Sequence, residues 1–195
     1  MTTSSATETR GVFYVHSALT ALCPHVEWAL GTVLNTRVQL EWTPQPAQSR
    51  TYRAEYSFVG TVGAAASIVS QLRGWEHLRF EVTEEGTSMS EGARYSYTPD
   101  LGVFHAVTGL HGDIMIPEDR LKAAVVKAAL GETTLLGEMD KLLGKPWDDE
   151  LEPFRHCDHR WVRIGTACDP GPRMAHPDFV VAETVLGLDD EVRGD

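Results

Sequence analysis

The chain has 195 residues, of which 42% are hydrophobic and 23% are charged; this composition is that of an ordinary globular protein and excludes the disordered, fibrous and membrane classes. Its 28 acidic and 17 basic residues leave a net charge of -11. Nucleic acid and anionic membrane surfaces are therefore excluded as main partners, because both would be repelled. A chain of this length forms one buried core with an extension rather than two independent domains.

The sequence favours a cytoplasmic protein. No apolar run reaches the roughly 20 residues that cross a bilayer, and residues 1–10, which we expect to be a flexible tail, lack the hydrophobic stretch of a signal peptide. The three cysteines, Cys23, Cys157 and Cys168, are odd in number and widely spaced. This pattern favours free thiols in a reducing compartment over a disulfide framework.

The first strand and helix are predicted at the start of the structured region. Val12 to Val15 is a continuous apolar run, typical of a central strand that is buried on both faces. Apolar residues then recur at helical spacing from Pro24 to Asn35. Alternating apolar and polar residues over 38–42 and 52–58 predict two antiparallel strands.

A second helix over 62–72 and a fourth strand over 78–82 complete the order β-α-β-β-α-β. This is the order of the ferredoxin-like split β-α-β arrangement, in which two helices cover one face of the sheet. We therefore predict an α+β protein with a ferredoxin-like core over residues 11–84. The strand at 12–15 is apolar on both faces, so something must cover the face that the helices leave open.

Residues 85–168 are predicted to be a hairpin plus helices packed on this core. The predicted strands and helices lie at 93–97, 103–107, 117–131 and 133–143. We expect this region to cover the apolar first strand, with a partner protein or a ligand as the alternative cover. The remaining segment, 169–195, is Pro-rich and acidic.

A candidate ligand site lies at the start of the second helix. Residues 60–63 follow a strand and open a helix, so their free N–H groups suit an anion such as phosphate or carboxylate. The segment lacks a full dinucleotide or Walker pattern, and helix capping explains it equally. We take Gly60, Thr61 and Gly63 as candidate ligand-binding residues, together with His16 at the end of the first strand. A structural, hydrogen-bonded His16 is the alternative.

Candidate metal ligands occur late in the chain. Cys157, His159, Cys168 and His176 offer the thiolates and imidazoles that a tetrahedral zinc site uses. The spacing is irregular and contains no Cys-x-x-Cys pair, so a segment that carries these residues without a metal is the alternative. No other cofactor is expected.

A candidate partner surface is the acidic and aromatic segment Trp147, Asp148, Asp149 and Glu150. It lacks the residue pattern of a calcium loop. The segment is typical of a solvated face or of a contact for a basic partner protein.

Three segments carry a resemblance to a known family: residues 11–17 (GVFYVHS), 23–30 (CPHVEWAL) and 94–102 (RYSYTPDLG). They resemble an uncharacterised family of actinobacterial proteins, a domain of unknown function, over nearly the whole chain. The resemblance supplies no catalytic residues. Because such proteins are encoded near fatty-acid synthesis enzymes, it implies an accessory role in fatty-acid metabolism.

Taken together, the sequence shows no catalytic set and favours a non-enzymatic cytosolic accessory or regulatory protein that binds another protein. A small-ligand sensor domain and a zinc-binding protein are the alternatives.

Overall fold

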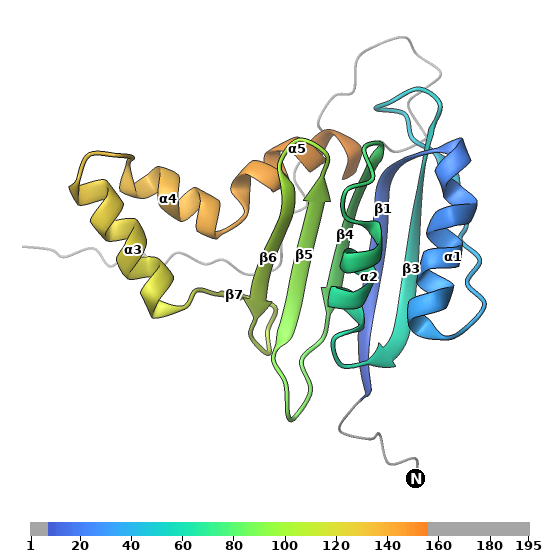
Figure 1. Cartoon of the computed structure of the whole chain (residues 1–195), viewed down its shortest axis with the longest axis horizontal. Helices are drawn as coiled ribbons and strands as arrows, with labels where there is room; N and C mark the ends of the chain where they lie inside the picture. The colour runs from blue at the N-terminus through green and yellow to red at the C-terminus, as the bar shows by residue number, and fades with distance from the viewer. Residues whose placement is uncertain (1–7, 156–195) are drawn as a thin grey trace, which may run out of the picture. The chain divides into compact units, whose positions relative to one another are not determined.

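The computed structural model describes residues 8–155. The chain divides into two units, Met1–Ile164 and Gly165–Asp195, and every described residue belongs to the first. In chain order the elements are β1 (Glu8–Leu19), a short 3-10 helix (Thr20–Leu22), α1 (Cys23–Leu34), β2 (Thr43–Pro44), β3 (Thr51–Thr61), α2 (Ala64–Leu72), β4 (Leu78–Glu84), β5 (Gly92–Thr98), β6 (Gly102–Thr108), β7 (Ile114–Met115), α3 (Glu118–Ala129), α4 (Leu135–Leu142) and α5 (Lys145–Arg155). The described part is a mixed α+β structure (Figure 1).

The strands form one antiparallel sheet in the order β2-β3-β1-β4-β5-β6-β7. β1 is hydrogen-bonded to β3 on one side and to β4 on the other, so its predicted interior position is confirmed. Its side chains alternate between the two faces of the sheet. Phe13 and Val15 are 0% and 2% exposed on one face, whereas Val12 and Tyr14 on the other are half-buried.

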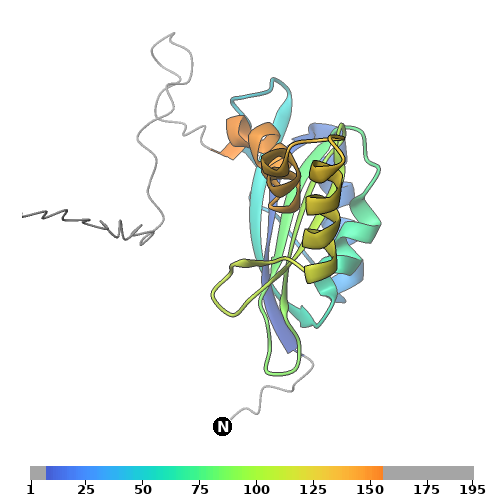
Figure 2. The ribbon, with the colours of Figure 1, turned by 90° about the vertical axis from the view of Figure 1, so that its left-hand side faces the viewer.

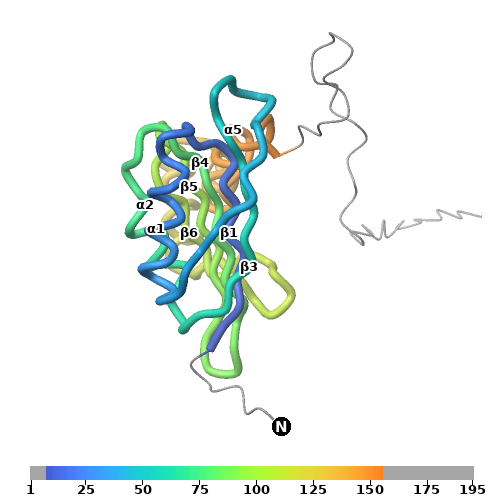
Figure 3. The backbone as a smooth tube through the Cα atoms, turned by 90° about the vertical axis from the view of Figure 1, so that its right-hand side faces the viewer, coloured from blue at the N-terminus to red at the C-terminus, as the bar shows by residue number. Residues whose placement is uncertain are grey.

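α1 and α2 cover the same face of the sheet (Figure 3). α1 has Pro24 in its first turn, where the missing N–H costs nothing, and ends at Asn35 in the left-handed conformation. Apolar side chains from both helices and from the central strands meet here. The largest fully buried ones are Phe13, Phe80, Leu30, Ile68, Leu72, Leu78, Val15, Val26 and Val82.

The strand predicted at 38–42 is wrong, because only Thr43 and Pro44 join the sheet as β2. The alternation itself is real, since Val38 and Leu40 are buried. The backbone N–H of Leu40 donates to the Glu27 carboxylate on α1, at 3.0 Å, instead of to a neighbouring strand. A side chain thus takes the place of a sheet partner.

The predicted hairpin exists as β5 and β6, but it does not cover β1. It pairs with β4, for example Glu81 opposite Ser96, and so widens the sheet beyond the four predicted strands. Without the hairpin, the edge of β4 would present unpaired backbone N–H and C=O groups. The hairpin satisfies them by adding a strand at this edge, which it could not do by packing on a face of the sheet. The helix that contacts the open face is α5, which packs against β1 and β5 (Figure 2).

α3 and α4 form a helical pair beside the β6 edge of the sheet (Figure 1). Leu121, Ala124, Val125 and Ala128 recur at helical spacing, and this pattern predicted that one face of α3 is buried. Of these only Ala124 is buried, whereas Leu121 and Val125 are 39% and 50% exposed. Across residues 8–155 no helix combines the length and apolarity that crossing a bilayer requires.

Candidate functional site

A pocket of about 550 Å³ opens on the sheet face opposite α1 and α2. Strands β1, β3 and β4 form its floor, and the last residues of α5 form one wall. Its polar lining comes from Tyr14, His16, Glu41, Thr43, Arg53, Glu55, Glu81 and Arg155. A pocket of this size with converging polar groups is where a small ligand would bind.

His16 reaches the pocket because of an irregularity in β1. The pairing of β1 with β3 and β4 shifts register just after Val15, and the strand bulges there. Bulges commonly re-aim a side chain at functional sites. The Gln45 side-chain amide donates to the His16 carbonyl at 2.6 Å and to the Phe154 carbonyl at 3.1 Å, so it ties the bulge to the end of α5.

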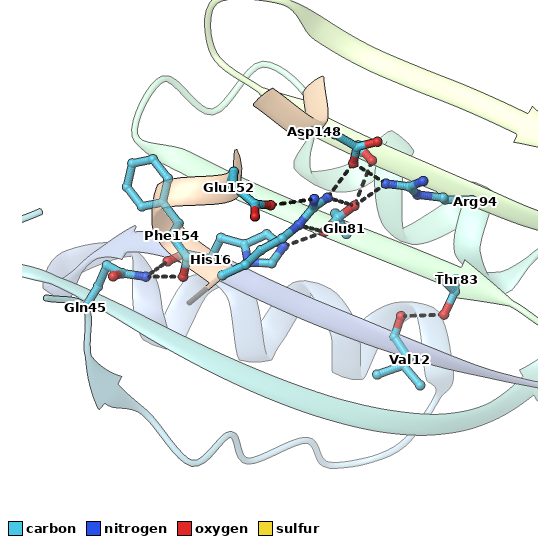
Figure 4. Close-up of polar contacts among 11 residues, drawn as sticks. Val12, His16, Gln45, Glu81, Thr83, Arg94, Asp148, Glu152 and Phe154 are labelled. Atoms are coloured by element: carbon cyan, nitrogen blue, oxygen red, sulfur yellow. Dashed lines mark hydrogen bonds and ion pairs between the residues drawn. The ribbon is translucent and has the colours of Figure 1, made fainter. Parts of the chain in front are cut away.

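The Glu81 carboxylate is the centre of a buried polar network (Figure 4). His16 Nε2 lies 2.7 Å from Glu81 Oε2, and Ser96 Oγ donates to Oε1 at 3.0 Å. Arg94 donates to Oε1 at 3.0 Å, and Arg155 binds both carboxylate oxygens at 2.7 and 3.1 Å. The network thus joins β1, β4, β5 and α5.

The Asp148 carboxylate joins the same two arginines from the side of α5, at 2.5 Å from Arg94 and 2.7 Å from Arg155. Two carboxylates and two guanidinium groups are therefore balanced in charge at the contact between sheet and helix. This satisfied arrangement can hold α5 in place without any ligand.

The pKa of Glu81 lies well below its ordinary value. Burial alone would raise it, but the hydrogen bond and charge of His16, together with Arg155, outweigh burial and lower it. Glu81 is therefore ionised at neutral pH and can only accept hydrogen bonds. It follows that the His16 Nε2 atom carries a proton and donates it to Glu81.

The second ring nitrogen of His16 is open. Nδ1 has no hydrogen bond to any residue in 8–155, and no buried side-chain nitrogen or oxygen of the described chain lacks a partner. His16 itself lines the pocket. Its Nδ1 atom accepts a hydrogen bond when the imidazole is neutral and donates one when the imidazole is protonated.

The β3 side of the pocket supplies charges that are not committed to ion pairs. Among residues 8–155, neither Arg53 nor Glu55 forms a salt bridge. Tyr14 lies between them and the network, and its pKa is raised by burial and then by the negative charges of Glu55 and Glu81. The pocket thus offers a guanidinium, a carboxylate, a phenol and an imidazole nitrogen.

The predicted anion site at residues 60–63 lies elsewhere, and an internal carboxylate already occupies its donors. The N–H groups of Gly63 and Ala65 donate to the two oxygens of Glu84, at 2.7 and 2.8 Å. Gly63 caps α2 with a φ of 89°, a conformation that favours glycine. Because Glu84 neutralises the helix start, Gly63 is explained by capping, and His16 does not line a common pocket with Gly60, Thr61 and Gly63.

Much of the acidic segment that was predicted to be a partner surface faces the protein's own arginines. Asp148 pairs with Arg94 and Arg155, and Glu150 pairs with Arg79 at 3.2 Å. Trp147 Nε1 donates to the Gly102 carbonyl at 3.0 Å and its ring packs on Phe104. Of the four residues only Asp149 is exposed, where it pairs with Lys145.

The predicted zinc ligands and the predicted free thiol of Cys23 lie in different parts of the chain. Cys157, His159, Cys168 and His176 lie outside the described residues, and residues 8–155 contain no group of side chains able to hold a metal ion. Cys23 is buried, donates weakly to the Leu19 carbonyl, and has a pKa raised mainly by burial. It therefore lacks the lowered pKa of a reactive thiol.

Sequence reasoning found His16 but missed its partners, Glu81, Arg94 and Arg155. The available signal was the alternation of β4, which places Glu81 on the face turned away from the helices. That pattern predicted a wet face with cross-strand ion pairs. Glu81 does pair across strands with Arg94, and α5 adds Arg155 and Asp148 to the same network.

Residues 12–163 match the model of a protein family described as a protein of unknown function, DUF3145. Because the match covers more than half of the chain, the chain belongs to this family. Neither a curated protein nor a solved structure is detectably similar to this chain.

Proposed function

We propose that this member of the DUF3145 family is a non-enzymatic small-ligand-binding protein whose binding site is the pocket on the open sheet face. The observation that carries the proposal is that His16, held by Glu81, lines a pocket of about 550 Å³ and has no hydrogen bond at Nδ1 to any residue in 8–155. A structural histidine would need only its bond to Glu81, whereas this one keeps a second ring nitrogen for a ligand.

The ligand best matched to the lining is a small zwitterion such as an amino acid. Arg53 suits a carboxylate, and Glu55 suits an ammonium group, because each is charged and without an ion pair among residues 8–155. His16 Nδ1 accepts a further hydrogen bond from the ammonium group.

The experiment is a thermal-shift screen of free amino acids, with nucleotides and acyl thioesters as comparison classes, followed by calorimetry on the compounds that raise the melting temperature. A ligand that binds only the folded state raises this temperature by mass action. We expect the response among amino acids. Indifference of the protein to every amino acid would contradict the proposal.

The variant His16→Gln separates the two roles of the histidine. The Gln amide nitrogen can still donate to Glu81, but no atom replaces Nδ1. We expect nearly unchanged stability and roughly tenfold weaker binding, the effect of one lost hydrogen bond. Arg53→Gln should weaken binding as well, whereas Arg73→Gln, an exposed change after α2, is the matched control. Equal binding by His16→Gln would contradict the assignment.

We also propose that β2, β3, β1 and β4 with α1 and α2 form a ferredoxin-like unit, which β5, β6 and β7 extend. The strand order and the placement of both helices on one face support this reading. We further propose a cytoplasmic setting in an actinobacterial cell, which the cysteine usage and the sequence resemblance support.

Binding of another protein is the second candidate function, and the observation that favours it is the apolar surface of α3 and α4. The exposed residues are Leu121, Val125, Val126, Leu130, Leu135, Leu136 and Leu143. Exposed apolar patches of several hundred Å² mark interaction sites. Residues 118–143 contain five acidic and four basic side chains, so this surface is nearly neutral in a chain of net charge -11. It suits an apolar, weakly charged partner face rather than the basic partner that the sequence predicted.

Affinity purification of the intact protein from native extract tests this candidate against a double variant, Leu130→Ser with Leu136→Ser. These side chains are 69% and 73% exposed, so the variant should fold normally. We expect a stoichiometric partner that the variant loses and that a Lys122→Gln control retains. A partner held equally by all three proteins would show that α3 and α4 are not the contact.

A further inference from the structure

A second described cavity, of about 360 Å³, lies where β6 meets α3 and α4. It exists because β7 pairs only with Val107 and Thr108, so the earlier residues of β6 have no further strand beyond them in the described sheet. α3 and α4 stand beside this edge (Figure 1), and Trp147 of α5 adds to the lining. The cavity is separate from the pocket that contains His16, with which it shares no lining residue.

The charge of this cavity is opposite to that of the chain. Its lining includes Arg120, Lys127 and Lys141 but only one acidic residue, Glu138. Glu138 lies between the two lysines, 3.4 Å from Lys127 and 3.0 Å from Lys141, so one carboxylate serves two ammonium groups. Three cations against one anion leave an excess of positive charge in a protein whose net charge is -11.

Arg120 provides the uncommitted cation. It forms no ion pair with any residue in 8–155. His105, on β6, lines the same cavity, and its pKa is lowered by burial and then by the positive charge of Arg120. The two side chains therefore repel each other when His105 is protonated, and an anion between them would relieve this repulsion.

The rest of the lining is apolar. The rings of Phe104 and Trp147 pack at a tilt with their centroids 5.2 Å apart, and Leu142 and Ala124 add aliphatic surface. Gly144 lets α5 start against Phe104, since a Cβ there would lie 2.7 Å from the ring. An apolar lining adds no binding free energy for a hydrated inorganic ion. A ligand with an apolar chain binds more tightly because it buries that chain against the lining.

From this combination we propose that the cavity between β6, α3 and α4 is a second ligand site, which binds an amphipathic organic anion. The anionic head lies at Arg120 and His105, and the apolar part passes the edge of β6 to Phe104, Trp147 and Leu142, because successive side chains of a strand point to opposite faces. The chemical class is a carboxylate or phosphate joined to a short apolar chain. This site acts independently of the zwitterion pocket.

The test uses octanoate as the probe, with inorganic phosphate and 1-octanol as comparison arms. Imidazole signals of the isotope-labelled protein are followed by NMR through a pH titration, and the loss of one signal in His105→Gln assigns the residue. We expect octanoate to raise the pKa of His105 and to bind with a measurable dissociation constant in calorimetry. Phosphate and 1-octanol should each bind more weakly, because each satisfies only half of the site.

Three variants locate the binding. Arg120→Gln should weaken octanoate binding by about tenfold or more, as expected for a lost charged hydrogen bond. Lys122→Gln is the matched control on the same helix, since Lys122 is exposed and pairs with Glu118 away from the cavity. His16→Gln should bind octanoate normally, which separates this site from the zwitterion pocket.

Three results would overturn the proposal. The first is a pKa of His105 that octanoate leaves unchanged. The second is equal weakening by Arg120→Gln and Lys122→Gln, which would indicate surface charge alone. The third is phosphate binding as tight as octanoate binding, since the apolar walls would then have no role.

Discussion

The two faces of the sheet are stabilised in different ways. On one face α1 and α2 enclose a continuous apolar core in which Phe13, Phe80 and Leu72 are fully buried. On the other face α5 is held by a network of charges centred on Glu81. Apolar burial is non-directional, whereas a buried charge is tolerated only when its partners are all in place. The open face is therefore the one whose side chains require specific partners.

The largest effect is expected on the apolar face. Phe80→Ala removes a fully buried ring that packs on Phe13 and Tyr97, at centroid distances of 5.8 and 5.1 Å. We expect the free energy of unfolding to fall by roughly 4 kcal/mol, because the change leaves a cavity. Urea denaturation measures it. Phe80→Leu should cost much less, and an equal cost for both variants would mean that the ring is not packed as described.

On the charged face, Glu81→Gln should lower the free energy of unfolding by roughly 3 kcal/mol. The change leaves Arg94 and Arg155 facing a neutral amide in a buried position, and breaking a buried ion pair is costly. Asp149→Asn is the control, since it breaks a single exposed pair with Lys145 and should cost below about 1 kcal/mol. Similar losses in the two variants would contradict a special role for Glu81.

The pH dependence of stability should also distinguish Glu81. Because its pKa is lowered in the folded protein, its contribution is present above the ordinary value of 4.5 and is lost as the pH falls below it. We expect the stability difference between wild type and Glu81→Gln to shrink by up to about 1.4 kcal/mol per pH unit below 4.5. Urea denaturation of both proteins at about pH 7, 5, 4 and 3 measures this difference in the free energy of unfolding. A constant difference would show that Glu81 is not held ionised by its partners.

The smallest effect is expected on α4. Leu136 is 73% exposed, so Leu136→Ser should change the free energy of unfolding by no more than about 0.5 kcal/mol. The same substitution at Leu72, which is 0% exposed, should cost several times more and is the internal comparison. A large loss in Leu136→Ser would mean that this leucine is buried in solution by a second surface.

Local patterns in the chain were enough to predict most of the elements. Pro24 and Asn35 bracket α1, and the alternation of 52–58 and 78–82 predicted strands that are present as β3 and β4. The turn residues at 98–102 predicted a hairpin, which is present as β5 and β6. In this turn Gly102 adopts a φ of 73°, a conformation that favours glycine. The mixed α+β class and a central β1 follow from these patterns, since periodicity reports which side of each element is buried.

Contacts between distant segments could not be read in this way. Nothing near Glu81 in the sequence indicates that Arg155, 74 residues later, neutralises it, or that Glu84 occupies the donors of Gly63. The pattern at 117–143 predicted a buried helical face that stays exposed, because periodicity shows an apolar side but not what meets it. Charge pairing and burial depend on which surfaces come together in three dimensions, and therefore the candidate pockets, unlike the strands and helices, emerged only from the folded arrangement.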